Sequence, residues 1–156
     1  MLAKEIMTSA VITIHENATI REAVERMLSN GISGLPVVDE QGRLVGVLSE
    51  SDLILHGSEP QVPHKLLNAI VKLLTHEEVE LKSAHDALAV ELAQVSQSTA
   101  GEFMTAPAYS VTPETPIETV AELITTHDIN RVPVIDNQTR VIGIISRHDL
   151  LRGMYQ

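Results

Sequence analysis

Two serine–aspartate pairs are the groups in this chain that could do chemistry. Ser49 and Asp52 form the first Ser-x-x-Asp, and Ser146 and Asp149 form the second. At a helix start the serine can accept an amide hydrogen bond and the aspartate favours the positive helix end, so each pair alone indicates a helix cap. A carboxylate can also accept two hydrogen bonds from a ribose diol, and a helix start can hold phosphate. The pairs therefore permit two interpretations, a structural cap and the recognition of a nucleotide.

The pairs belong to a longer internal repeat with an offset of 97 residues, since 149 − 52 = 97. The match runs without a gap over residues 5–54 and 102–151. Such self-similarity indicates a duplicated structural unit. Units of about fifty residues bury little surface alone, so we expect the repeats to share a core and to bind a ligand in the cleft between them. The aligned motifs include Met7-Thr8 with Met104-Thr105 and Pro36-Val37 with Pro133-Val134.

Hydrophobic periodicity and turn residues predict the order β-α-β-β-α in each repeat, which is an α+β fold. In the first repeat a helix starts at the capping box of Thr19 and ends at Gly31. In the second repeat Thr115 is the expected cap of a helix whose first residue is Pro116. Ser49 and Ser146 are expected to open the last helices. The predicted strands are Val11–Ile14, Leu35–Val38, Arg43–Leu48, Ala108–Val111, Val132–Ile135 and Arg140–Ile145.

Residues 57–100 match neither repeat. Apolar residues recur there every seven positions, at Leu67, Leu74, Leu81, Leu88 and Val95. This spacing predicts helix, either an amphipathic helix or hairpin packed on the repeats or a coiled coil that forms a dimer interface. The segment could also cover one ligand cleft. Residues 96–101 are predicted to be a flexible exit. The sequence thus divides into a first repeat at 1–56, a helical insertion at 57–100 and a second repeat at 101–156.

Composition narrows the class of function. The 11 basic and 21 acidic side chains give a net charge of −10, which argues against nucleic acid as a partner. Aromatic residues make up 2% of the chain, too few to stack many bases. With no cysteine, neither a disulfide framework nor a thiolate metal site is expected. No apolar run reaches the roughly 20 residues of a membrane span, and the first residues lack a signal-peptide core, so we expect a cytoplasmic protein.

The ordered set of motifs resembles a tandem pair of cystathionine-β-synthase (CBS) domains, called a Bateman module. The motifs are Met-Thr at the start of each repeat, the x-Pro-Val-(Val/Ile)-Asp strand, and the ending Gly-h-h-Ser-x-x-Asp-Leu, where h is aliphatic. The resemblance covers residues 5–54 and 102–151. It implies a pair of repeats that binds an adenosyl ligand between them, such as AMP, ADP, ATP, S-adenosylmethionine or NAD, with no obligatory cofactor.

The resemblance also implies roles for individual residues. Asp52 and Asp149 would hold the ribose hydroxyls, and Ser49 and Ser146 would bond to ribose or phosphate. The adenine pockets would be lined by Thr13, Leu35 and Pro36 in the first site, and by Ser110, Val132 and Pro133 in the second.

The two implied sites differ in charge. The position two residues before the proline often faces phosphate in this family, and it is Gly34 in the first repeat but Arg131 in the second. Arg147 and His148 add charge to the second site. A hydrogen bond to a charged group contributes ~1.5–3 kcal/mol, so we expect stronger phosphate binding at the Asp149 site. The alternative for Arg131 is an exposed arginine at the hairpin edge that binds no ligand.

Catalysis gains little support from the sequence. Ser146, His148 and Asp149 lie within four residues at a helix start, where their side chains point to different sides, so they cannot form a catalytic triad. The histidines show no metal-ligand spacing. We therefore expect a regulatory, energy-sensing module rather than an enzyme.

The expected module forms a homodimer and controls a partner protein in trans. The expected dimer contact uses the apolar faces of the repeat helices, near Ile20, Val24, Ile117 and Ala121. The competing hypothesis is a ligand-free assembly module. In that case Ser-x-x-Asp is a helix cap and the helical insertion is the interaction surface.

Overall fold

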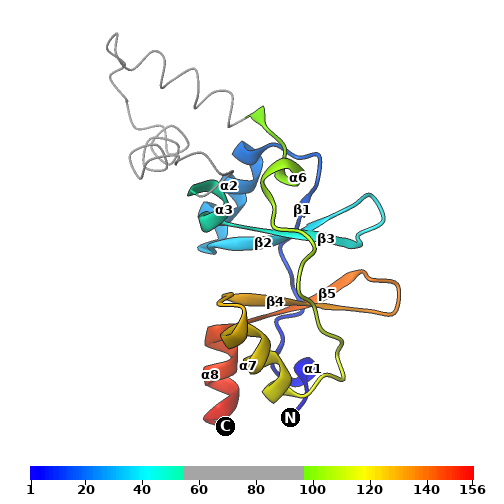
Figure 1. Cartoon of the computed structure of the whole chain (residues 1–156), viewed down its shortest axis with the longest axis vertical. Helices are drawn as coiled ribbons and strands as arrows, with labels where there is room; N and C mark the ends of the chain where they lie inside the picture. Colours follow the sequence, from blue (N-terminus) through cyan, green and yellow to red (C-terminus); the bar gives the residue numbers. More distant parts are fainter. Residues whose placement is uncertain (55–96) are drawn as a thin grey trace. The chain divides into compact units, whose positions relative to one another are not determined.

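The computed structural model describes residues 1–54 and 97–156, so the predicted helical insertion and its heptad leucines lie outside the described residues. The chain forms two compact units that interleave in sequence. Unit 1 contains Met1–Thr13, Val38–Val45 and Pro107–Gln156, and unit 2 contains Ile14–Val37 and Gly46–Ala106. Both units combine strands with helices (Figure 1). The mixed α and β architecture predicted from the sequence is therefore confirmed.

Unit 2 is built on a three-stranded sheet with the order β1-β2-β3. Helix α2 begins after Thr19, whose hydroxyl accepts a hydrogen bond from the amide of Glu22 at 3.2 Å, and it ends at Gly31 in the left-handed conformation, with φ of 61°. The predicted start and end of this helix are both confirmed. The elements are β1 (Ile14–His15), α2 (Ile20–Asn30), β2 (Gly34–Val38), β3 (Leu44–Ser49), α3 (Glu50–Ile54) and α6 (Ala100–Phe103).

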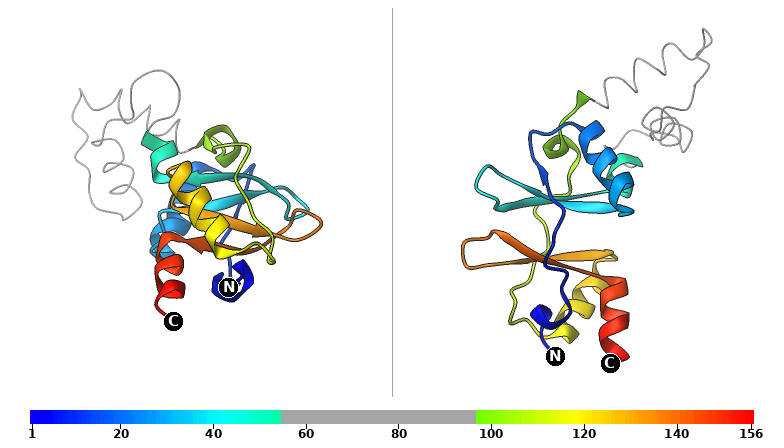
Figure 2. Two further views of the ribbon diagram at one scale, coloured as in Figure 1. Left: turned by 60° about the horizontal axis from the view of Figure 1, so that its bottom comes forward. Right: turned by 180° about the vertical axis from the view of Figure 1, so that it is seen from behind.

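Unit 1 is built on an antiparallel hairpin of β4 (Arg131–Ile135) and β5 (Val141–Ser146). Helices α7 (Ile117–Thr126) and α8 (Arg147–Met154) lie on one side of this hairpin together with the short α1 (Ala3–Ile6) (Figure 1). The same grouping is visible from behind in Figure 2. The core between the helices and the hairpin contains Ala3, Val111, Val120, Ile124, Val132, Val134, Ile145 and Leu150.

The Met-Thr motif that starts each repeat pairs with the strand of the other repeat. In unit 1, Thr8 and Ile144 exchange two backbone hydrogen bonds of 2.9 and 3.0 Å. In unit 2, Thr105 and Val47 do the same at 2.9 and 3.1 Å. The methionine before each threonine lies against the strand glycine, Met7 on Gly143 and Met104 on Gly46. The recurrence of Met-Thr and glycine at the same offset therefore reflects two equivalent packing contacts.

Two boundaries in the first half of each repeat differ from prediction. Strand β1 is Ile14–His15 rather than Val11–Ile14, and in place of a strand at Ala108–Val111 a single parallel bridge joins Val111 to Val134. Short β-branched runs indicate strand type better than strand ends, because the pairing partner decides where hydrogen bonding begins.

The start of α7 also differs from prediction. Pro116, not Thr115, is the N-cap residue of this helix. The Thr115 hydroxyl instead accepts a hydrogen bond from the amide of Thr112 at 3.1 Å. The threonine thus closes the preceding turn, a competing use of the same side-chain oxygen.

The described part of the predicted flexible exit is ordered structure. Thr99 caps α6 with a reciprocal box, in which its hydroxyl accepts from the amide of Glu102 at 3.3 Å and a Glu102 carboxylate oxygen accepts from the amide of Thr99 at 2.9 Å. Ala100 is fully buried. The prediction was wrong because Thr-x-x-Glu is itself a helix-start signal.

The helix faces expected at a dimer contact are used inside the chain. Ile20 and Val24 are 0% and 4% exposed, and Ile117 and Ala121 pack against the core of unit 1. Ile20 and Val24 therefore have no apolar surface left for a second copy of the chain, whereas Ile117 and Ala121 are only half-buried. The dimer contact near these helices stays a prediction. Over residues 1–54 and 97–156, no helix has both the length and the apolar character needed to cross a membrane.

Candidate functional site

The second serine–aspartate pair sits where β5 runs into α8. Ser146 is the N-cap of α8, and its hydroxyl accepts from the amide of Asp149 at 3.2 Å. In return, Asp149 Oδ2 accepts from the amide and the hydroxyl of Ser146, both at 2.9 Å. The other oxygen, Oδ1, accepts from Arg152 Nη2 at 2.5 Å. The Asp149 side chain is 8% exposed, so this is a nearly buried carboxylate with two differently held oxygens.

The first pair has nearly the same geometry at the end of β3. Asp52 Oδ2 accepts from the amide of Ser49 at 2.8 Å and from its hydroxyl at 3.1 Å. The Ser49 hydroxyl also lies 2.7 Å from that of Ser51. Asp52 Oδ1 accepts from the hydroxyl of Thr105 at 2.5 Å. Both copies therefore fix one carboxylate oxygen by the cap serine and leave the other to a donor from outside the pair.

Four further predicted residues lie in or beside the hairpin that carries the second pair. Arg131 is the strand partner of Ser146, and Val132 is the partner of Ile145. Pro133 is buried, and its carbonyl accepts from the amide of Val111 at 3.0 Å. Ser110 precedes Val111 and is half-buried. Arg131 thus lies directly beside the pair, where β4, β5 and the start of α8 meet, whereas Pro133 pairs with Ile144 farther along the hairpin.

Arg147 is held at its own position. Its Nη2 donates to Asp128 at 2.9 Å and its Nε donates to the carbonyl of Ile129 at 3.0 Å. Asp128 is 95% exposed on its side chain and has a positive φ of 49°. The Arg147 guanidinium is thus engaged in fixing the turn after α7. His148 is exposed at the start of α8.

In the first repeat, Gly34, Leu35 and Pro36 are buried in β2. They belong to unit 2 together with Ser49 and Asp52, whereas Thr13 belongs to unit 1. Adjacent to β2, the carbonyl of Ser33 accepts from the amide of Glu50 at 3.0 Å. This bond ties the entry of β2 to the start of α3.

Two residues that contact the carboxylates were missed at the sequence level. Thr105 belongs to the Met-Thr motif, which recurs at the same offset as the pairs and could have indicated a shared site. Arg152 follows Asp149 by three residues, a spacing that places two side chains on one helix face. Both patterns are visible in the sequence, but only the structure shows which carboxylate oxygen Thr105 and Arg152 each contact.

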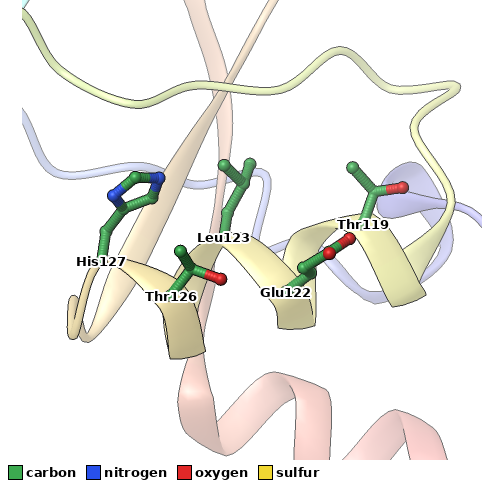
Figure 3. Close-up of a pocket in the computed structure, with 5 residues that line it drawn as sticks. All are labelled: Thr119, Glu122, Leu123, Thr126 and His127. Carbon is green, nitrogen blue, oxygen red and sulfur yellow. The ribbon is translucent and has the colours of Figure 1, made fainter.

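Two surface hollows lie elsewhere in unit 1. One, of about 240 Å³, runs along α7 and is lined by Thr119, Glu122, Leu123, Thr126 and His127 (Figure 3). The ring of His127 stacks on Tyr109 with centroids 3.9 Å apart. The other, of about 620 Å³, is lined by Gln41, Arg43, Gln138 and Arg140. None of these residues is a predicted site residue.

The arginines of the second hollow already have partners. Arg43 Nε donates to Asp39 at 2.8 Å and Arg140 Nε donates to Asp136 at 3.0 Å. Burial raises the pKa of each aspartate, but hydrogen bonds from backbone amides and from the paired arginine outweigh it and hold both pKa values below the ordinary range. These pairs stabilise the hairpin turns and neutralise the two cations.

Comparison with known proteins identifies the family of the two repeats. The profile of the CBS domain matches residues 3–59 and 100–155. The uncharacterized protein MJ1426 of Methanocaldococcus jannaschii is 31% identical over 162 residues, which cover 99% of this chain and 91% of that protein. An L-aspartate semialdehyde sulfurtransferase of the same organism is 28% identical over 151 residues, which cover 97% of this chain but 23% of the enzyme.

The chain also resembles a solved structure in its fold. The CBS domain pair of protein MJ0100, in complex with 5′-methylthioadenosine and S-adenosyl-L-methionine, is 27% identical, with a TM-score of 0.67 and coverage of 99% of both chains. The resemblance predicted from the repeated motifs is confirmed. This chain belongs to the CBS domain family and carries two CBS domains in tandem.

Proposed function

We propose that this chain is a regulatory module that binds an adenosyl ligand through the carboxylates of Asp52 and Asp149. The observation that carries the proposal is the geometry of Asp149, a nearly buried carboxylate with one oxygen bonded to an exposed arginine. A helix cap needs the oxygen that faces Ser146, whereas the second oxygen is placed for an exchangeable donor. A ribose diol has the two adjacent hydroxyl donors that such a carboxylate can accept.

The ligand class is taken from a relative. The MJ0100 domain pair is described in complex with two adenosyl compounds, neither of which carries a phosphate. Adenine linked to ribose is the part that those compounds share with AMP, ADP, ATP and NAD. We therefore propose that the chain recognises the adenosyl group. The group attached to the 5′ carbon of its ribose is to be tested.

The proposed sites keep the residues predicted from the sequence. Asp52 and Asp149 hold the ribose, and Arg131 favours phosphate in the second site by a charge-assisted hydrogen bond. The remaining proposed contacts are Thr13, Gly34, Leu35, Pro36 and Ser49 in the first site, and Ser110, Val132, Pro133, Ser146, Arg147 and His148 in the second. The proposed division of the sequence stays at 1–56, 57–100 and 101–156.

The proposed output is control of another protein. The match to a short part of a longer sulfurtransferase supports a module that works beside catalytic domains. We infer that this chain regulates a partner in trans and pairs with a second copy of itself. Light scattering of the purified chain would test the pairing, with twice the 17.0 kDa chain mass expected.

Ligand binding is tested by thermal unfolding with AMP, ADP, ATP, NAD, S-adenosylmethionine and 5′-methylthioadenosine. A ligand at a hundred times its dissociation constant should stabilise the fold by ~2.7 kcal/mol, which is several degrees for a domain of this size. Asp149→Asn keeps a cap oxygen but weakens diol recognition, so the ligand-induced shift should shrink.

The matched control is Asp136→Asn, which removes a carboxylate of unit 1 that lies in a hairpin turn. Its ligand-induced shift should equal that of the unchanged chain. If no adenosyl compound shifts the unfolding temperature, the proposal is wrong and the ligand-free assembly module becomes the better hypothesis.

A further inference from the structure

The two carboxylates differ in the donor that holds their second oxygen. Asp149 Oδ1 is bonded to the guanidinium of Arg152, three residues later on α8. Asp52 Oδ1 is bonded to the neutral hydroxyl of Thr105. Among residues 1–54 and 97–156 no buried side-chain nitrogen or oxygen lacks a hydrogen-bond partner. Each Oδ1 thus has one donor already in place, and a ligand hydroxyl that approaches along the same direction has to replace that donor.

The sequence explains why the two carboxylates have different donors. The position equivalent to Arg152 in the first repeat is residue 55, since 152 − 97 = 55, and that residue is Leu55. The counterpart of Thr105 is Thr8 in the first repeat, which is exposed and pairs with Ile144 through its backbone. The first carboxylate thus receives a hydroxyl, and the second receives a cation on its own helix.

The exposure of Arg152 favours its displacement from Asp149. Its side chain is 61% exposed, whereas that of Asp149 is 8% exposed. The guanidinium can rotate into water at little cost, because an arginine at the surface keeps its hydration. The carboxylate stays in place, since the amide and hydroxyl of Ser146 hold its other oxygen. Exchange of donors at Oδ1 therefore needs no movement of the backbone.

We propose that Arg152 is a displaceable occupant of Asp149 and sets how tightly this carboxylate binds a vicinal diol. The inference rests on the proposed function and adds a specificity-determining residue to it. A neutral diol that takes the position of the guanidinium breaks the ion pair and leaves Arg152 without a counter-charge. A ligand that carries phosphate supplies an anion near the freed guanidinium. The Asp149 site therefore discriminates against uncharged adenosyl compounds, whereas the Asp52 site does not.

The test compares adenosine with AMP by calorimetry in the full chain with Asp52→Asn, so that the Asp149 site reports alone. Replacing Arg152 by Gln in this background should tighten adenosine binding about fivefold, the upper range for an exposed ion pair. Adenosine should gain more than AMP, so the preference for AMP should fall. Arg152→Lys retains a cation and should bind adenosine as weakly as the Arg152 protein.

Salt gives an independent readout. Raising the salt concentration screens the ion pair, so adenosine should bind more tightly at high salt when Arg152 is present and should be insensitive to salt in Arg152→Gln. Arg21→Gln is the matched control, because Arg21 is an exposed helical arginine paired with Glu25 at 3.4 Å. It should leave both affinities unchanged.

The outcomes separate the two proposals. If neither adenosine nor AMP binds any of these proteins, the proposed function fails and this inference fails with it. If both bind and Arg152→Gln leaves the adenosine affinity and its salt dependence unchanged, the inference alone is overturned. A purely structural role of Arg152 in α8 would lower the unfolding temperature and would not tighten adenosine binding.

Discussion

Two methionines occupy the space that a side chain would need on Gly46 and Gly143. A Cβ on Gly143 would lie against the sulfur of Met7 and 3.0 Å from its Cγ. A Cβ on Gly46 would meet the sulfur of Met104 and lie 3.0 Å from the carbonyl oxygen of Thr105. These distances are shorter than ordinary contacts between carbon atoms. The glycines are therefore required by close packing of two chain segments.

We predict that Gly143→Ala destabilises the protein by about 1–3 kcal/mol, the usual cost of overpacking. Shortening the neighbour in Gly143→Ala/Met7→Ala should recover part of this loss, because the new methyl group then has room. Urea unfolding of the two single variants and the double variant measures the coupling. Strictly additive losses would show that the methionine is not what excludes the methyl group.

At the same scale, the sequence predicts the role of a residue best when its partner is close in the chain. Ser146 and Asp149 form the capping box that their spacing indicates. The bond from Thr105 to Asp52 joins residues 53 positions apart, and nothing in local spacing indicates it. Arg152 follows Asp149 by three residues, so the helical spacing rule indicates their contact.

The two hairpin turns are stabilised by the same local hydrogen-bond pattern. In β2–β3 and β4–β5 an aspartate accepts hydrogen bonds from two turn amides and from an arginine four residues later. The two turns thus repeat one solution at the offset of 97 residues.

These turns predict a specific response to acid. The pKa values of Asp39 and Asp136 are lowered in the folded protein, so their stabilising effect is present above the unfolded pKa of about 4 and is lost as the pH falls through the folded values. The double variant Asp39→Asn/Asp136→Asn should therefore lose less stability between about pH 4 and pH 2 than the unchanged chain. Denaturant unfolding at a series of pH values measures this, and equal acid dependence in both proteins would contradict it.

Helices were predicted more reliably than first strands, for a physical reason. Caps and breakers such as Thr19 and Gly31 act within a few residues. A strand of two residues such as Ile14–His15 is defined by its neighbour. The predicted order of elements therefore held in the first repeat, whereas in the second repeat the first strand is reduced to the single bridge of Val111 to Val134.

On the scale of the whole molecule, each compact unit draws on both repeats. The core of unit 1 includes Ala3, which is fully buried. Its backbone amide donates to Thr115 at 2.8 Å, and the amide of Ile117 donates to the carbonyl of Met1 at 3.1 Å. A repeat defined by sequence similarity and a compact unit of the structure therefore contain different residues. The internal sequence repeat alone does not indicate that the first residues of each repeat pack against the other repeat.

Deleting residues 1–8 should consequently loosen the second repeat, although the deletion lies in the first. The amides of Ile144 and Ile117 lose their acceptors, Thr8 and Met1, and should exchange hydrogen faster. The amide of Val47, which donates to Thr105 at 3.1 Å, is the matched control and should change less. Hydrogen exchange resolved by residue measures all three rates. Unchanged protection at Ile144 would count against the exchange of segments.

The pairing of Thr8 with Ile144 also has a consequence for the time course of synthesis. The two residues are 136 positions apart, since 144 − 8 = 136. At roughly 5–20 residues per second, the ribosome needs about 7–27 s to make the partner after Thr8 itself. Thr105 follows Val47 by 58 positions, since 105 − 47 = 58, and waits less than half as long. Unit 2 can thus close its Met-Thr contact while unit 1 is still being made, and one of the first segments to be synthesised is among the last to find its place.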